Sequence, residues 1–542
     1  MVFAFSLPTT SHLQFQSFFQ SESHPSLPQR ATATRNALRI ALKKHKRLSP
    51  AQRTAHLAHI NEALNEYLPY LFAISRGLSS SQTTLSAGQQ RGTHSNLPGD
   101  LDIILKTELE VEWQPTLSSR SSLRFLRMGG IGRSNTSSSS RASGSRVKGR
   151  GLDFEIAFVL STLAYVLSSL ARVRYLTTLY ANTTPSAQQK TAAIQAAVKN
   201  LLLANSIHTY VSNLPPTALS SPSNNYVPDA TGAEQLFISI PDLNPSIQSA
   251  LASLAMAEAT LLAVLKDDAY VSVSIQARNR FDTEWMVKAP DIPKVRALLF
   301  ARLCVRAAEY ADQAAAGAGA VKKACATDPA NMGKLDDTVS NYMHGLARVA
   351  RAKACRFFAI DAEIAGNLGE GIAWLSAGRA SLGVRGSIAG EEAEGSSSDR
   401  KTKGKLSGGF ARLRREWSDR REERKIEEAT SSSKTQSAEL ETDIDYGDDV
   451  GREEEGKVIE MLEKKWVKMN DTINTQSIPP STSLISNLPS GRDIHSTPAS
   501  YVPPTLDPEQ LERMRGPPDA SDNINGESSG EDDDFEGESS YY

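Results

Sequence analysis

Residues 151–171 read GLDFEIAFVLSTLAYVLSSLA, and this stretch decides the fold. Leucines recur at helical spacing along one side of it, and Phe158, Val159 and Val166 occupy the other sides. A helix that is apolar on nearly every side is buried in the middle of a protein. Its uncharged run, 156–171, is 16 residues long, whereas a membrane span needs roughly 20. We therefore predict a central core helix that does not cross a membrane.

Other segments with helical periodicity surround this core helix. Small residues such as Ala307, Ala311 and Ala350 are frequent in them, which allows neighbouring helices to approach closely, as in antiparallel hairpins. Residues 109–113 alternate as a strand does. We predict a mainly α fold with a small β-sheet. The predicted helices are 34–48, 50–78, 187–211, 245–266, 269–286, 292–316 and 335–382, the last one broken or kinked near 366–371.

Three polar segments interrupt or follow this helical pattern. Residues 118–150 contain eight arginines and lysines and no acidic residue. Residues 386–456 pass from a basic block to an acidic block, and residues 505–542 end in an acidic tail. Such segments bury too little apolar surface to order themselves. We predict one domain over residues 1–504, with disordered insertions at about 118–150 and 386–456, and a disordered tail at 505–542.

Charge and cysteine content bear on the compartment and the partners. The net charge is −2, so no overall field attracts nucleic acid or an anionic membrane. Cys304, Cys325 and Cys355 have no paired spacing, and the amino terminus does not read as a secretory leader. These features predict a cytoplasmic protein with buried free thiols.

The sequence carries no phosphate-binding Gly-rich loop, no HExxH and no CxxC. His56, His59 and Glu62 share a helix face that could hold a metal, but a solvated face explains them more simply. The basic segment 118–150 could contact acidic lipid or RNA or be a solvated linker, and its scarcity of aromatic residues argues against RNA. We predict no enzyme activity, no cofactor, no metal and no nucleic-acid partner.

The stretch 251–265, LASLAMAEATLLAVL, has one apolar stripe that contains both Leu261 and the charged Glu258. Core packing is the default interpretation of such a stripe. A charge inside the stripe indicates instead that this side is not fully buried, which makes it a candidate groove for a partner helix. Both interpretations stay open at this point.

Several stretches, in this order along the chain, resemble the BRO domain of the ALIX type. They are a strand with a tryptophan (109–117) followed by the helix 152–171, the stretch 251–265, the segment AGNLGEGIAWLSAGRASL within 354–382, and KMNDTINTQSIP at 468–479. LPSGRDIH at 488–495 and YVPP at 501–504, ahead of an acidic tail, resemble the fungal pH-response members of this family.

The resemblance implies a curved body of TPR-like helical hairpins with a small antiparallel sheet. It also implies a non-catalytic adaptor in alkaline-pH signalling, recruited to cortical or endosomal membrane sites. Its apolar patch would bind the carboxy-terminal helix of the ESCRT-III core subunit through Leu261, Val271, Ile275 and Leu488. The alternatives are a helical scaffold with another protein client, and a peripheral membrane-binding module that uses the basic segment 118–150.

Overall fold

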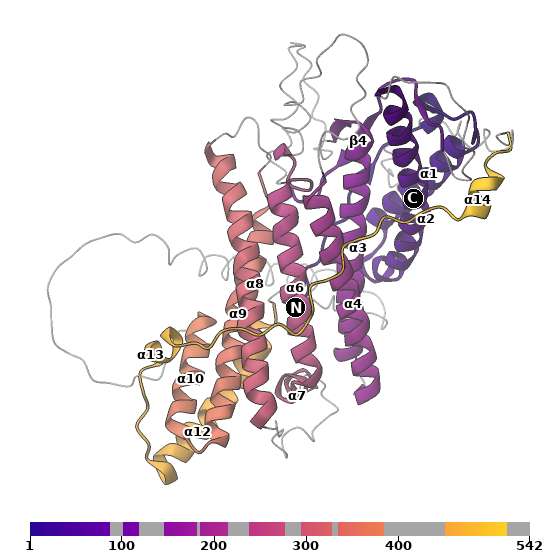
Figure 1. The fold of residues 1–542 in the computed structure, drawn as a ribbon. Coiled ribbons are helices and arrows are strands. Elements are labelled where there is room, and N and C mark those ends of the chain that lie inside the picture. The colour runs from indigo at the N-terminus through magenta and orange to yellow at the C-terminus, as the bar shows by residue number, and fades with distance from the viewer. Residues whose placement is uncertain are drawn as a thin grey trace, which may run out of the picture. The chain divides into compact units, whose positions relative to one another are not determined.

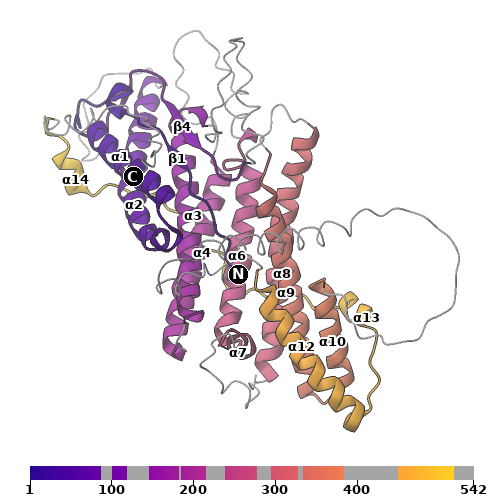
Figure 2. The ribbon, with the colours of Figure 1, turned by 180° about the vertical axis from the view of Figure 1, so that it is seen from behind.

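The computed structural model describes residues 1–86, 101–118, 146–181, 185–214, 238–276, 294–327, 334–383 and 450–517. All of these belong to a unit that comprises Met1–Val384 and Tyr446–Tyr542; the second unit, Arg385–Asp445, lies outside the described residues. Figures 1 and 2 show the chain from two opposite sides.

The unit is mainly helical, as predicted. Helices α3, α4, α6, α8, α9 and α10 pack in this order, each against the next (Figure 1). The helices are α1 (Leu27–Arg47), α2 (Pro50–Ser86), α3 (Leu152–Leu179), α4 (Ala187–Ser212), α6 (Pro245–Asp267), α7 (Ala269–Gln276), α8 (Lys294–Thr327), α9 (Asp337–Ile364), α10 (Leu368–Ser381), α12 (Arg452–Met469), α13 (Ser481–Ser486) and α14 (Pro508–Arg513).

Helix α3 is the predicted core helix. Helices α3 and α6 are both long and apolar enough to cross a membrane, but 83% of the apolar window of each is buried inside the protein. Small residues bring α6 and α8 close together: a Cβ at Gly317 would lie 3.2 Å from the Cβ of Ala250. The predicted break near 366–371 is confirmed, because α9 ends at Ile364 and Gly366 takes a positive φ of 85° before α10 begins.

A small antiparallel sheet confirms the predicted β-structure. It has three strands in the order β1-β4-β5: β1 (Thr9–Thr10), β4 (Glu110–Gln114) and β5 (Val147–Arg150). A second, two-stranded sheet is formed by β2 (Phe19–Gln20) and β3 (Ile104–Leu105). Glu155 of α3 fixes the three-stranded sheet to the helices. Its buried carboxylate accepts hydrogen bonds from Arg35 Nε at 2.8 Å, Tyr67 OH at 3.0 Å and Trp113 Nε1 at 2.7 Å.

The predicted disorder boundaries are wrong at three places. Val147–Arg150 forms β5, and the side of this strand at Gly149 packs against Phe154. Helix α12 begins at Arg452, inside the predicted insertion 386–456, and α14 lies inside the predicted tail 505–542. Each of these ends carries a few buried side chains that average composition conceals, such as Glu455 and Met514. Residues 119–145, 386–449 and 518–542 of these segments lie outside the described residues, as does the end of the predicted helix 269–286.

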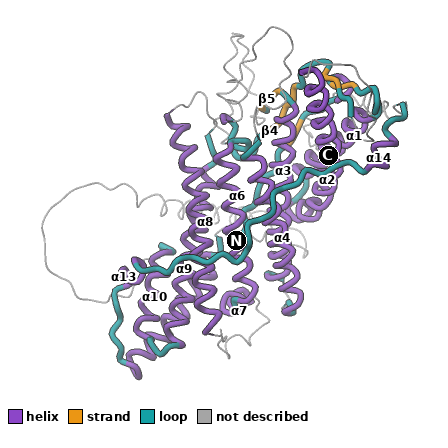
Figure 3. The backbone as a smooth tube through the Cα atoms, in the orientation of Figure 1, coloured by secondary structure: helices purple, strands orange, loops and turns teal. Residues whose placement is uncertain are grey.

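A returning segment, residues 475–517, crosses the helices in the reverse of their chain order. Figure 3 shows it as a loop that leads from α13 to α14. It contacts α8 through Asp493, which pairs with Arg306 at 2.8 Å, and then α4, where the rings of Tyr501 and Tyr210 lie 5.4 Å apart. It ends against the start of α1, where Ser26 Oγ donates to the Met514 carbonyl at 2.9 Å.

Candidate partner-binding groove

Three of the four predicted partner-binding residues are buried. The exposed fraction is 1% for Leu261, 2% for Val271 and 7% for Ile275, and Leu488 is half-buried against the same hydrophobic core. Of the two interpretations of this stripe, core packing is therefore confirmed, and the interpretation that this side of α6 is not fully buried is wrong. In this structure Leu261, Val271 and Ile275 pack inside the hydrophobic core between the helices.

The charge in the α6 stripe is buried because an amino-terminal segment covers it. The Glu258 carboxylate accepts hydrogen bonds from the Phe3 N–H at 2.8 Å and from Tyr342 OH at 3.0 Å. The ring of Phe3 packs on Tyr342, and Phe5 stacks on Tyr165 of α3. Burial raises the pKa of Glu258 to about 7, although both hydrogen bonds favour the ionised form. Glu258 is therefore a hydrogen-bonded core residue.

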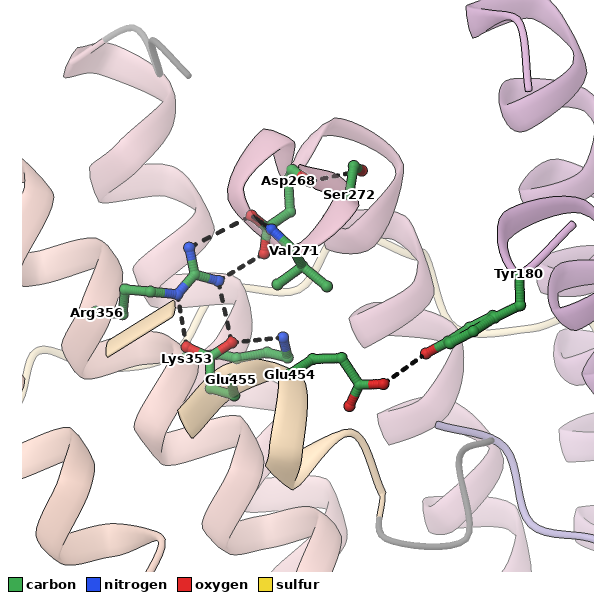
Figure 4. Close-up of polar contacts among 8 residues, drawn as sticks. All are labelled: Tyr180, Asp268, Val271, Ser272, Lys353, Arg356, Glu454 and Glu455. Carbon is green, nitrogen blue, oxygen red and sulfur yellow. Dashed lines mark hydrogen bonds and ion pairs between the residues drawn. The ribbon is translucent and has the colours of Figure 1, made fainter. Parts of the chain in front are cut away.

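Val271 lies beside a buried ion network that joins three helices (Figure 4). Arg356 of α9 donates to Asp268 at 2.6 Å and to Glu455 of α12 at 2.5 Å, and Lys353 donates to Glu455 at 2.7 Å. Asp268 in turn accepts the Val271 N–H at the start of α7. Burial opposes ionisation of Asp268, but the charges of Arg356 and Lys353 hold its pKa below the usual value. The network has a structural role.

A groove of about 540 Å³ opens between α4, α6 and α8, and its lining includes Asp267, the chain neighbour of Asp268. Its lining is mostly aliphatic or aromatic, and one side is formed by the returning segment. The lining residues are Ile194, Gln195, Val198, Lys199 and Leu202 of α4, Ala263, Lys266 and Asp267 of α6, Arg296, Leu299, Phe300 and Leu303 of α8, and Ile494 and His495.

Two runs of consecutive apolar residues explain why this surface is apolar. Each run places three large apolar side chains within less than one helical turn: residues 201–203 on α4 and residues 298–300 on α8. Three consecutive side chains point in directions too far apart around the helix for one hydrophobic core to cover all of them. In each run the innermost residue is buried, the next one is half-buried in the groove, and the last is exposed, to 42% for Leu203 and 44% for Leu298. Neither run is among the residues predicted to bind a partner.

The rim of the groove is cationic. Lys199 and Arg296 are exposed at its edge. Lys266 is also in the lining, and its ammonium lies 3.7 Å from the Asp267 carboxylate. An apolar floor with a cationic rim is complementary to an amphipathic helix that carries acidic residues beside its apolar stripe.

The returning segment is held firmly where it forms the side of the groove. Arg492 N–H donates to the Arg302 carbonyl at 3.1 Å, and Asp493 accepts from Arg306 and from Tyr310 OH, at 2.8 and 2.6 Å. Gly491 permits this close approach, because a Cβ there would lie 2.7 Å from the Arg306 Cα. The LPSGRDIH segment singled out in the sequence therefore contributes Ile494 and His495 to the groove, while Leu488 packs on the core.

The described residues offer little for metal or thiol chemistry. They contain no group of three or more His, Cys, Asp or Glu side chains arranged to hold a metal ion. The rings of His56 and His59 lie 5.3 Å apart, on the exposed side of α2. Burial raises the pKa of Cys304 and of Cys355 to about 12, which keeps both thiols protonated and poorly nucleophilic.

Comparisons with known proteins place the chain among regulators. No family model matches it. It is 49% identical over 521 residues to the pH-response regulator protein palC of Emericella nidulans, covering 96% of this chain and 92% of the relative. A solved complex of the ALIX BRO1 domain with CHMP4C matches with a TM-score of 0.44 and 12% identity, over 94% of this chain and 98% of that one. A Bro1 domain studied for endosomal targeting matches with a TM-score of 0.42 and 14% identity, over 95% of both chains.

Proposed function

The chain belongs to the family of the pH-response regulator palC, and we propose that it is a non-catalytic adaptor in ambient alkaline-pH signalling. In this proposal it binds the carboxy-terminal helix of the ESCRT-III core subunit and is recruited to cortical or endosomal membrane sites. The observation that carries the proposal is the apolar groove between α4, α6 and α8 with its cationic rim. The binding surface thus consists of groove residues, and Leu261 supports it from the core.

The groove suits one amphipathic helix better than an extended peptide. Its α4 and α8 side chains, such as Val198, Leu202 and Leu299, recur at helical spacing and present ridges into which the apolar stripe of another helix can pack. No strand edge borders it among the described residues, so an added β-strand has no hydrogen-bonding partner there. Acidic residues flanking the stripe would lie near Lys199 and Arg296.

Two substitutions on adjacent residues test this function. Leu299→Asp places a charge inside the groove, whereas Leu298→Asp places the same charge on the neighbouring exposed position. We expect Leu299→Asp to weaken binding of the ESCRT-III core subunit by about 2–4 kcal/mol, a roughly thirtyfold to thousandfold change, and Leu298→Asp to leave it within threefold, about 0.6 kcal/mol. Removing the carboxy-terminal helix from the subunit should abolish binding to the parent chain.

The rival function is a helical scaffold with another protein client. An array of ESCRT-III tail peptides and unrelated amphipathic helices separates the two, because only the adaptor proposal requires selective binding of the core-subunit tail. In cells, Leu299→Asp should impair growth at alkaline pH without a general endosomal sorting defect, and Leu298→Asp should grow normally.

A further inference from the structure

The turn between α1 and α2 concentrates positive charge at one end of this helical hairpin. Residues 27–61, which include all of α1 and the first turns of α2, contain eight arginines and lysines and no acidic residue. Exposed cations gather around the turn itself, and we call this group the cationic hairpin end: Lys44, Lys46, Arg47 and Arg53.

Hydrogen bonds to the hairpin backbone and to strand β4 hold two of these cations in place. Arg53 Nη2 donates to the Lys46 carbonyl at 3.0 Å, and Lys46 Nζ donates to Gln114 Oε1 at 3.2 Å. Within the described residues, no carboxylate forms an ion pair with any member of the cationic hairpin end. Burial lowers the pKa of the neighbouring His45 to about 4, and the charge of Arg53 contributes to this shift. The local potential is therefore positive.

Helix dipoles do not explain this arrangement. Basic residues in the last turn of α1 offset the partial negative charge at a helix carboxyl end. The amino end of α2 carries the opposite partial charge and favours acidic residues, yet its first turn has none and Arg53 follows closely. Both helices therefore add cations to the same turn, at a small cost in stability, which indicates an anionic partner.

We propose that the cationic hairpin end docks on an anionic phospholipid bilayer, with Ile40 entering the headgroup region. Ile40 is 54% exposed and lies four and seven residues before Lys44 and Arg47, which places all three on one side of α1. An apolar side chain beside a basic group is the composition of surfaces that bind membrane interfaces. Residues 27–61 contain no Phe, Tyr or Trp on which bases could stack, so a nucleic acid is disfavoured.

A vesicle-binding assay with the full chain tests the docking surface. The vesicles consist of phosphatidylcholine alone or of phosphatidylcholine mixed with phosphatidylserine. The parent should bind only the mixed vesicles, and less at high salt. Each Lys or Arg near an anionic surface contributes about fivefold, so K44Q/K46Q/R47Q should weaken partitioning roughly a hundredfold. The matched control K464Q/K465Q/K468Q on α12 changes net charge equally and should bind as the parent does.

Three outcomes would overturn the proposal. In the first, the parent shows no preference for vesicles that contain phosphatidylserine. In the second, the hairpin and α12 variants lose binding equally, which assigns the effect to net charge. In the third, a single-stranded RNA binds the parent but not the hairpin variant while vesicles bind neither. Because the hairpin end is separate from the groove, K44Q/K46Q/R47Q should bind the ESCRT-III tail normally, so failure here leaves the proposed function intact.

Discussion

Arg356 on α9 and Glu455 on α12, 99 residues apart, form a buried ion pair with Nε and Oε1 2.5 Å apart. Neither side chain is exposed. The segment between them includes residues 384–449, which the structure does not describe, so this pair is where the chain rejoins the helical body. Helix α12 also packs on α10, through Trp466 and Gly371.

Glu455→Ala should destabilise the protein by about 3–5 kcal/mol, because it leaves Arg356 and Lys353 buried with a single remaining carboxylate, Asp268. Chemical denaturation followed by circular dichroism measures the loss. The control is Glu460→Ala on the same helix, which removes an exposed pair with Lys464 and should cost about 0.5 kcal/mol or less. Equal effects of the two substitutions would contradict the role assigned to the network.

Glu258 should make stability fall as pH rises from about 4.5 to about 7. Its pKa is about 7 in the folded chain and 4.5 as a free side chain, so between these values the folded state keeps a proton that the unfolded state has released. Its contribution to the unfolding free energy is complete below pH 4.5 and is lost as pH rises through 7. The unfolding free energy of Glu258→Gln, measured relative to that of the parent, should therefore increase by on the order of 3 kcal/mol when pH is raised from 5 to 8. A difference that stays constant over this range would contradict the assignment.

Two truncations test the anchoring of the returning segment. Removing residues 518–542 should leave the melting temperature unchanged, because no described contact is lost. Removing residues 505–542 also deletes α14 and the buried Leu506 and Met514, which are 7% and 5% exposed. We expect the second truncation to cost about 3 kcal/mol or more, since burial of one large apolar side chain contributes about 1.5–3 kcal/mol. Equal melting temperatures would show that α14 does not anchor the chain.

Leu261→Asp should unfold the protein. The side chain is 1% exposed, so the substitution removes apolar packing and buries a charge without a partner. Leu→Ala at such a position costs about 2–5 kcal/mol, and an unpaired charge adds to that cost, against a typical total stability of about 5–15 kcal/mol. Circular dichroism should show lost helicity, while the control Ser249→Asp, exposed on the same helix, should keep it. A folded Leu261→Asp variant would restore the interpretation that this side of α6 is not fully buried.

Hydrophobic periodicity predicted the helices because the pattern that identifies a helix, such as α3, lies entirely within its own stretch of sequence. The environment of Glu258 was not predictable in this way, since its hydrogen-bond donor Phe3 lies 255 residues away. A charge in an apolar stripe looks the same in sequence whether water or a distant segment solvates it. The boundaries at Val147 and Glu455 were missed for a related reason: a few buried side chains order the end of a segment whose average composition is polar.

The site was only partly predictable. The resemblance pointed to α6 and to the segment 488–495, both of which contribute residues to the groove, but three of the four residues that it selected are buried in the core. The α4 and α8 residues that form most of the groove carried a readable signal in the runs 201–203 and 298–300, because three consecutive large apolar residues cannot all face one core. Which of the three faces outward depends on helix phase, and only the structure supplies it.

Calorimetric titration of the ESCRT-III core-subunit tail into the variants Leu202→Asp and Leu203→Asp tests most directly whether the groove is the binding site. These neighbours on α4 receive the same charge, but only Leu202 lines the groove. Circular dichroism first establishes that both variants are folded. Leu202→Asp should bind roughly thirtyfold to thousandfold more weakly than the parent, and Leu203→Asp should bind within about threefold of it. A folded Leu202→Asp variant that binds as tightly as the parent would contradict the groove as the binding site.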